Sequence, residues 1–262
     1  MIIDIHTHIY SEKDYKDYFK RAKNQVAKAI VLDYKPVSPG LAQLIKLSRQ
    51  NPNIFIVPTI EMNKNISSQL KILEKYFQQK QIYGIKLYPG YEYFYPSDKK
   101  VWPIARLCLK YNKPLIFHSG DVYDPAGGAL LKYAQPIHID ELAVKMTQCK
   151  IVISHFGFPR FMETANIVSK NDNVYTDISG TIDETSNQKE AVSLLSQYRN
   201  DLLRVLNYFP NIKSKIMFGT DYGGEGTPLY QIQPYINLVK QIFTAKEQRT
   251  VFYDLAEQIY FG

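Results

Sequence analysis

The sequence predicts an α/β protein that folds as a single (β/α)8 TIM barrel. Short apolar runs alternate with longer amphipathic segments, there are eight such runs, and 262 residues is about the length of one barrel. No long linker or low-complexity stretch divides the chain, so we expect one domain over residues 1–262.

The apolar runs are rich in isoleucine and valine and are bounded by polar residues, proline or glycine, which is typical of buried parallel strands. They lie at 2–5, 28–33, 54–60, 82–88, 114–118, 150–155, 173–178 and 215–220. Between them, apolar residues recur at three- and four-residue intervals, which predicts helices that cover the sheet. Examples are 12–27, 38–50, 67–79, 98–112, 160–170 and 188–209.

A doubly wound open sheet is the competing architecture. However, the first strand is not followed by G-x-G-x-x-G, and the chain contains no G-x-x-x-x-G-K-[ST]. The count of eight strands therefore favours a closed barrel.

Potential metal ligands stand at the ends of several apolar runs. His6 and His8 form an H-x-H pair on the first strand, where alternation places both side chains on one face. His118, His155 and Asp221 each close a later run. The C-terminal ends of the strands converge on one face of a parallel barrel, and imidazole is a common zinc ligand, so we expect a metal site on that face.

The chain resembles the amidohydrolase superfamily, in particular the amidohydrolase-related (amidohydrolase 2) metal-dependent hydrolases. The resemblance spans nearly the whole chain, and it rests on six segments whose order is specific although each is weak alone. They are DIHTH at 4–8, GIKLYP at 84–89, FHSG at 117–120, SHFG at 154–157, YTDISG at 175–180 and FGTDY at 218–222. The C-terminal segment 254–262 departs from the family pattern, because it lacks an expected asparagine.

The resemblance implies that His6, His8, His118 and Asp221 hold one divalent ion, which we expect to be zinc. His155 would contact a metal-bound water or bind a second ion. Lys86 falls where some family members have a carboxylated lysine or a glutamate that bridges two metals. One or two ions, and a modified or unmodified lysine, remain open at this point.

These residue types suit hydrolysis. A divalent ion lowers the pKa of bound water from 15.7 to about 7. Asp221 could take the proton from that water and deliver it to the leaving group, while His155 stabilises an oxyanion or positions the water. Unmodified Lys86 would instead bind a substrate carboxylate or phosphate. Asp4 is a candidate for orienting a ligand imidazole.

Two long loops, 88–96 and 120–135, are expected to shape a pocket at this end of the barrel. The first is rich in tyrosine and begins with Tyr88, a candidate substrate-binding residue. Its rings could stack on a flat substrate, or simply cover the barrel mouth.

Each site residue also has a purely structural interpretation. Asp221 could cap a helix, His118 and His155 could be core histidines bonded to backbone, and Lys86 could pair with an acidic neighbour. All of these residues stand at the ends of apolar runs, and such an arrangement is improbable if each of them has only a structural role. His138 closes no apolar run, and we interpret it as a helix-start or surface residue.

The charge and cysteine content of the chain indicate which kinds of binding partner to expect. The net charge is +7 and the pI is about 9.1, but the lysines are scattered instead of forming a basic block, which favours a small-molecule substrate over nucleic acid. Cys108 and Cys149 lack C-x-x-C spacing, so neither a disulfide framework nor a thiolate zinc site is implied. Without a signal peptide or an apolar span, we expect a cytoplasmic protein, and homo-oligomerisation stays open.

Four functions compete. The leading hypothesis is a metal-dependent hydrolase acting on an amide, lactone or other ester of a small polar molecule. The alternative is a metal-dependent, non-oxidative decarboxylase of an aromatic or unsaturated carboxylic acid. A TatD-like nuclease fits less well, because 84–87 lacks the Gly-Glu-x-Gly-Leu-Asp segment of that group. A non-catalytic metal-binding protein is the fourth possibility.

Overall fold

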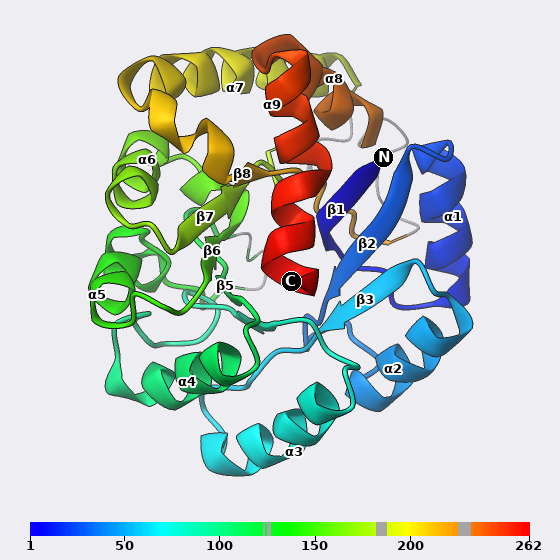
Figure 1. Cartoon of the computed structure of the whole chain (residues 1–262), viewed down its shortest axis with the longest axis vertical. Coiled ribbons are helices and arrows are strands. Elements are labelled where there is room, and N and C mark those ends of the chain that lie inside the picture. Colours follow the sequence, from blue (N-terminus) through cyan, green and yellow to red (C-terminus); the bar gives the residue numbers. More distant parts are fainter. Residues whose placement is uncertain (123, 125–126, 182–187, 225–231) are drawn as a thin grey trace.

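The computed structural model shows eight parallel strands surrounded by helices, and it describes residues 1–122, 124, 127–181, 188–224 and 232–262 (Figure 1). The strands fall within or close to all eight predicted runs. They are β1 Ile2–Thr7, β2 Val26–Leu32, β3 Ile54–Val57, β4 Ile85–Leu87, β5 Leu115–Phe117, β6 Ile151–Ile153, β7 Val174–Asp177 and β8 Ile216–Met217.

The strands form a three-stranded and a five-stranded parallel sheet, and hydrogen bonds bridge both junctions between them. Between β3 and β4, the Lys86 N–H donates to the Pro58 carbonyl at 2.9 Å. Between β8 and β1, the Ile5 N–H donates to the Phe218 carbonyl at 3.0 Å. The ring is therefore continuous, and the fold is a TIM barrel, as predicted.

The helices lie outside the ring. They are α1 Glu12–Ala22, α2 Leu41–Gln50, α3 Ile66–Gln78, α4 Trp102–Lys110, α5 Ile137–Lys145, α6 Phe161–Lys170, α7 Gln188–Tyr208, α8 Ile232–Ile242 and α9 Ala245–Arg249. Six of them, α1 to α4, α6 and α7, fall within or close to the six predicted segments. The prediction of one helix over 12–27 is wrong at its end. Lys23 and Asn24 have φ values of 49° and 60°, which stop α1, and Val26 already belongs to β2.

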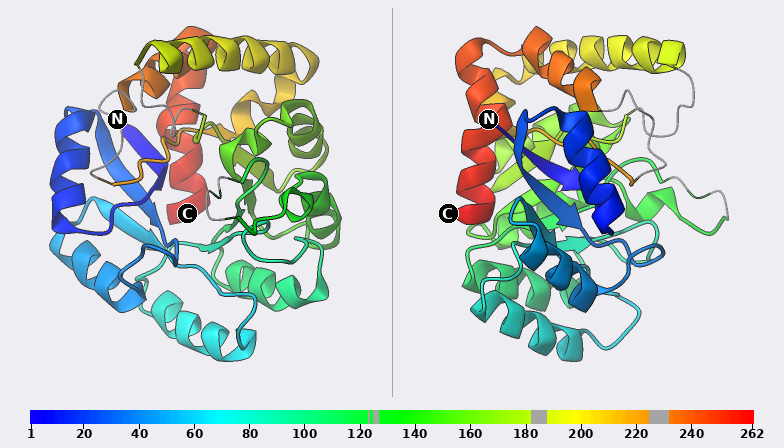
Figure 2. Two further views of the ribbon diagram at one scale, coloured as in Figure 1. Left: turned by 180° about the vertical axis from the view of Figure 1, so that it is seen from behind. Right: turned by 90° about the vertical axis from the view of Figure 1, so that its right-hand side faces the viewer.

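The C-terminal helix closes one end of the barrel. It continues from α9 through two π-helical stretches, Thr250–Asp254 and Glu257–Phe261, and lies across the strands in Figure 1 and behind them in the left panel of Figure 2. Leu255 and Ile259 pack against the apolar residues inside the ring. Lys113, just before β5, donates to the Tyr260 carbonyl at 2.7 Å, so the helix covers the N-terminal end and leaves the opposite end for a site.

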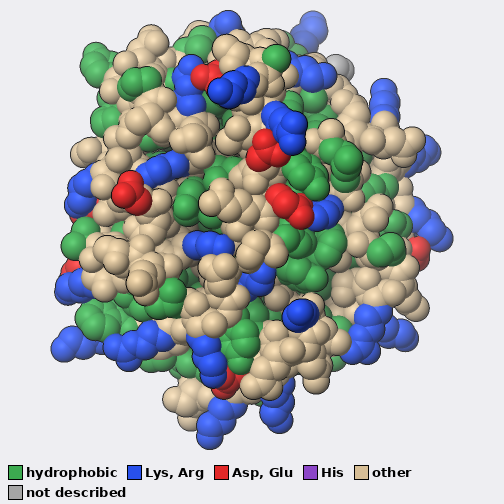
Figure 3. Space-filling view, viewed as in Figure 1, with side chains coloured by type: hydrophobic (Ala, Val, Ile, Leu, Met, Phe, Trp, Pro, Cys, Tyr) green, Lys and Arg blue, Asp and Glu red, His purple; other side chains and the backbone are tan. Residues whose placement is uncertain are grey.

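The surface cations and the two cysteines are arranged as the sequence predicted. On the face that Figure 3 shows, lysines and arginines are scattered and form no single patch. Cys108 and Cys149 are buried free thiols. Within the described ranges, no helix has the length and apolar character needed to cross a bilayer.

Candidate metal centre

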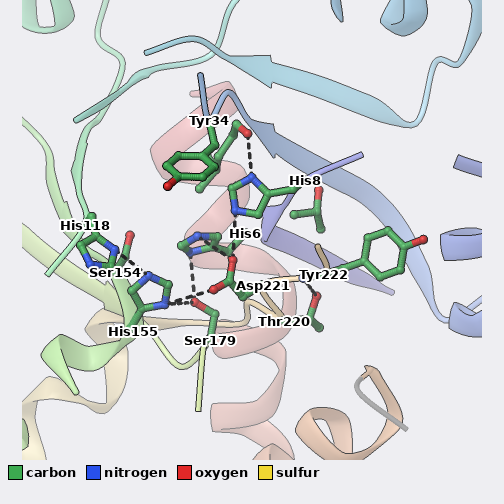
Figure 4. Close-up of polar contacts among 12 residues, drawn as sticks. His6, His8, Tyr34, His118, Ser154, His155, Ser179, Thr220, Asp221 and Tyr222 are labelled. Atoms are coloured by element: carbon green, nitrogen blue, oxygen red, sulfur yellow. Dashed lines mark hydrogen bonds and ion pairs between the residues drawn. The ribbon is translucent and has the colours of Figure 1, made fainter. Parts of the chain in front are cut away.

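Three histidines surround one carboxylate at the C-terminal end of the strands (Figure 4). Asp221 Oδ1 lies 3.2 Å from His6 Nε2 and 3.1 Å from His8 Nε2, and Asp221 Oδ2 lies 3.7 Å from His155 Nδ1. His6 lies on β1 and His8 follows its last residue in extended alternation, so both rings reach Asp221 from the same face. Asp221 follows β8, and its N–H donates to the His6 carbonyl at 2.8 Å.

Hydrogen bonds determine which nitrogen of His6 and His8 carries the proton. His6 Nδ1 lies 3.1 Å from Asp177 Oδ2, and His8 Nδ1 lies 3.0 Å from the Leu32 carbonyl oxygen. An ionised carboxylate and a carbonyl only accept, so both Nδ1 atoms carry a hydrogen. In the neutral form of each ring, the lone pair on Nε2 therefore faces Asp221 Oδ1.

Two lone pairs and a carboxylate oxygen this close repel one another unless a cation lies between them. Burial lowers the pKa of His6, so His6 itself does not supply that charge by protonation at neutral pH. The separations of 3.1 and 3.2 Å are close to the edge of about 3.3 Å of a tetrahedron with bonds of about 2.0 Å. His6, His8 and Asp221 therefore fit a divalent metal ion.

His118 lies beside His155 and not beside Asp221. Its Nδ1 is 3.2 Å from His155 Nε2, and its Nε2 is 2.7 Å from the Asp121 carbonyl oxygen. That carbonyl only accepts, so His118 Nε2 carries the hydrogen and His118 Nδ1 accepts from His155 Nε2. His118 belongs to neither cluster of potential ligands among the described residues, and its predicted role as a ligand stays a prediction.

The backbone of His155 is held in a left-handed conformation, with φ 61° and ψ 22°. Its N–H donates to Asp177 Oδ1 at 2.9 Å, which helps to offset the cost of about 1–3 kcal/mol of such a conformation. Gly180 gives the ring its space, because a Cβ there would lie 2.3 Å from His155 Nδ1. Burial lowers the pKa of His155 to about 3, so the imidazole is neutral.

The sequence alone does not single out Asp177 and Ser179, which complete the site. Ser179 Oγ donates to Asp177 Oδ1 at 2.6 Å and lies 3.0 Å from His6 Nδ1 and 3.1 Å from His155 Nδ1. His6, His155 and Asp177 form a second cluster of potential ligands. Its nitrogen and oxygen atoms, however, already contact one another or Ser179 Oγ at hydrogen-bonding distance. A signal was available, because Asp177 ends a strand just as the predicted ligands do.

Lys86 is completely buried on β4. Its Nζ donates to Ser154 Oγ and lies 5.3 Å from the centroid of the Tyr88 ring. No ion pair of Lys86 occurs among the residues that the structure describes, so the pairing with an acidic neighbour is not seen. Burial lowers the pKa of Lys86 to about 8.

The expected contact of Asp4 with a ligand imidazole does not form. Asp4 Oδ1 accepts from the backbone N–H groups of His6 and Thr220, each at 3.1 Å. Asp4 Oδ2 accepts from the hydroxyls of Tyr18 at 2.7 Å and Thr220 at 2.6 Å. Asp4 thus ties β1 to the segment after β8, while Asp177 contacts the His6 ring.

Tyr88 lines a cavity of about 370 Å³ formed by segments that follow β2, β3, β4 and β5. Its ring lies 6.3 Å from that of His118. Of the predicted loop 120–135, residues 123 and 125–126 lie outside the described residues. His138 does not line the cavity and lies in the first turn of α5 against Tyr95, as its interpretation as a helix-start residue predicted.

A parallel barrel whose histidines and aspartate meet at the strand ends defines a class of metal-dependent enzymes. The model of the amidohydrolase family matches residues 3–262, and the chain belongs to that family. Members are generally metal-dependent, which agrees with the donor set described above. A search of curated proteins found no match.

Solved structures share the fold at low sequence identity. A probable 2-pyrone-4,6-dicarboxylic acid hydrolase from Acinetobacter baumannii is 13% identical, with 100% of this chain and 99% of that one covered and a TM-score of 0.67. A 5-carboxyvanillate decarboxylase from Sphingomonas paucimobilis is 12% identical, with 99% and 98% covered and a TM-score of 0.67. A dihydroorotase from Campylobacter jejuni is 18% identical, with 100% and 83% covered and a TM-score of 0.63. The neighbours thus include both hydrolases and a decarboxylase.

Proposed function

We propose that the protein is a hydrolase that uses a metal-activated water on an amide, lactone or other ester of a small polar molecule. The observation that carries the proposal is the convergence of His6 Nε2 and His8 Nε2 on Asp221 Oδ1. We propose zinc as the ion, with His118 as a further ligand only if its contact with the Asp121 carbonyl opens. When bound, the ion would bring the pKa of a water to about 7.

Asp221 and His155 would then carry the proton of the attacking water to the leaving group. Asp221 would stay ionised, since the positive charge of the bound ion favours the carboxylate over the protonated acid. It can accept the proton of the attacking water on Oδ2 and share it with His155 Nδ1, 3.7 Å away, which carries no hydrogen because His155 Nε2 donates to His118. Neutral His155 is a weak base, so it would release that proton readily to the leaving group.

Decarboxylation of an aromatic or unsaturated acid is the second candidate. It is favoured by the buried ammonium of Lys86, which has no carboxylate partner among the described residues and adjoins the Tyr88 ring. In this reaction Lys86 would attract the substrate carboxylate, and Asp221 or His155 would handle the proton.

The test begins with metal analysis of protein purified without added metal, followed by turnover assays on amide, lactone and ester panels in ¹⁸O-labelled water. We expect about one zinc per chain, ¹⁸O in the product, and loss of activity in His6→Ala and Asp221→Asn. Release of carbon dioxide without ¹⁸O incorporation would identify a decarboxylase. Full activity of both variants would refute the proposed mechanism. Two zinc ions with a labile carboxyl mass on the intact chain would support a bridging, carboxylated Lys86.

A further inference from the structure

The cavity beside the metal centre carries an excess of negative charge. Three carboxylates and one ammonium line it, namely Glu61, Glu92, Asp124 and Lys35. The ammonium is already neutralised, because Lys35 Nζ lies 2.9 Å from Asp33 Oδ2. Glu61 pairs with Lys64 at 2.8 Å, whereas Glu92 and Asp124 have no ion-pair partner within the described part of the chain. A cation from outside the protein would therefore be favoured here.

A backbone hydrogen bond holds the Glu92 carboxylate in place. Its Oε1 accepts from the Met62 N–H at 2.6 Å, which fixes the side chain against the loop after β3. Burial raises the pKa of Glu92 and the nearby charge of Glu61 raises it further, although the charge of Lys100 and the backbone N–H groups of Met62 and Asn63 act in the opposite direction. A ligand cation that paired with Glu92 would relieve both effects.

Tyrosine rings form the other walls of the cavity. The ring centroid of Tyr34 lies 5.1 Å from that of Tyr88 and 5.8 Å from that of Tyr91, and the rings meet at 52° and 68°. The Tyr88 side chain is 8% exposed, and its hydroxyl is buried without a hydrogen-bond partner in the described structure. Such an arrangement of aromatic walls with adjacent carboxylates suits a planar cation, which is attracted to ring faces and to negative charge together.

The same tyrosines adjoin the metal centre. The Tyr91 ring centroid lies 5.0 Å from that of His118, and the Tyr34 ring centroid lies 6.3 Å from that of His8. The cavity is therefore separated from these histidines by a single tyrosine ring.

Building on the proposed hydrolase function, we propose that this cavity binds a planar nitrogen cation, such as an amidinium or guanidinium group, at the non-reacting end of the substrate. The substrate class is then a cationic amide or ester. Glu92 and Asp124 pair with the cation, and the rings of Tyr34, Tyr88 and Tyr91 enclose it.

The test uses benzamidine and benzamide, which have the same shape but differ in charge. Dissociation constants are measured by calorimetry on the full zinc-loaded chain. We expect benzamidine to bind at least fivefold more tightly than benzamide. Equal binding of the two probes, or no binding of benzamidine, overturns the proposal.

Substitutions of cavity residues test whether the preference for benzamidine over benzamide arises in this cavity. Glu92→Gln keeps an oxygen for the Met62 N–H, and we expect it to remove most of the preference for benzamidine, as Asp124→Asn should in part. Tyr91→Leu should weaken both probes. The matched control is Glu141→Gln, the same change on an exposed position of α5. An unchanged preference in Glu92→Gln, with the protein folded by circular dichroism, contradicts the assignment.

The His6→Ala variant separates this proposal from the proposed reaction. We expect it to lose metal and turnover while binding benzamidine with unchanged affinity, because His6 does not line the cavity. Benzamidine selectivity without turnover of any ester or amide would refute the reaction and leave the cation site standing. Turnover without benzamidine selectivity would refute the cation site alone.

Discussion

Asp177 Oδ2 lies 3.1 Å from His6 Nδ1. The last residue of β7 therefore keeps the proton on Nδ1 of a histidine ring that belongs to β1. Asp177 Oδ1 meanwhile accepts from the backbone N–H groups of His155 and Ser179 at 2.9 and 3.0 Å. One carboxylate thus orients the histidine expected to bind metal and the histidine expected to handle protons.

We expect Asp177→Asn to weaken zinc binding by about 10- to 100-fold, because an amide cannot hold the His6 Nδ1–H with the strength of a carboxylate. A competition titration with a zinc chelator measures the affinity. Asp140→Asn is the control, since Asp140 pairs with Lys170 on the outer helices. Unchanged zinc affinity in Asp177→Asn would show that Asp177 does not support the ligand ring.

Gly180→Ala should reduce activity far more than stability. Gly180 has φ 79°, and an added Cβ would lie 2.3 Å from His155 Nδ1, so the ring must move. Gly40→Ala is a matched control, because Gly40 has φ 94° but its added Cβ would meet only Gln43 Oε1 at 3.8 Å. Both variants should lose about 1–3 kcal/mol of stability from the backbone strain. Urea denaturation and turnover assays distinguish the two effects, and equal activity in both variants would contradict the role assigned to Gly180.

Lys86→Met should stabilise the metal-free protein near pH 7. Burial lowers the pKa of Lys86 from 10.5 to about 8, so below pH 8 the folded state bears the full cost of a buried ammonium. Between about pH 8 and 10.5 the unfolded chain binds more protons, so this contribution to stability rises with pH and the cost disappears. The cost is about 3 kcal/mol at most. Urea denaturation from pH 7 to pH 10, in chelator, should show the wild-type and variant curves converging. Parallel curves would refute the buried, charged lysine, and Lys145→Met is the exposed control.

Metal removal should destabilise the wild-type protein by mass action, because the ion binds the folded site. At zinc concentrations about 100 times the dissociation constant, the gain is about 2.7 kcal/mol. Thermal melts with zinc and with chelator measure it. His6→Ala should show no such shift, whereas His138→Ala should behave as wild type since His138 lies on α5. A full zinc shift in His6→Ala would place the metal elsewhere.

The eight strands could be predicted because their signal is local. A buried parallel strand is a short apolar run, and the ends of such runs already identified His6, His8, His155 and Asp221, which the structure brings together. The exact ends of α1 were harder to predict, because Lys23 and Asn24 stop the helix in left-handed conformations that their residue types only weakly favour.

What only the tertiary structure decided is which polar groups face each other across strands. Asp177 and Ser179 join the site because the register between β6, β7 and β8 places them beside rings from β1 and β6. The pairing of β4, β5 and β6 buries Lys86 beside Ser154, and the turn after β5 leaves His118 against the Asp121 carbonyl. The sequence by itself determined the barrel and the kinds of ligand at its mouth, since those depend on the order of residues along each strand. The pairing of nitrogens with oxygens depends on distances between segments far apart in the chain, which closing the barrel establishes.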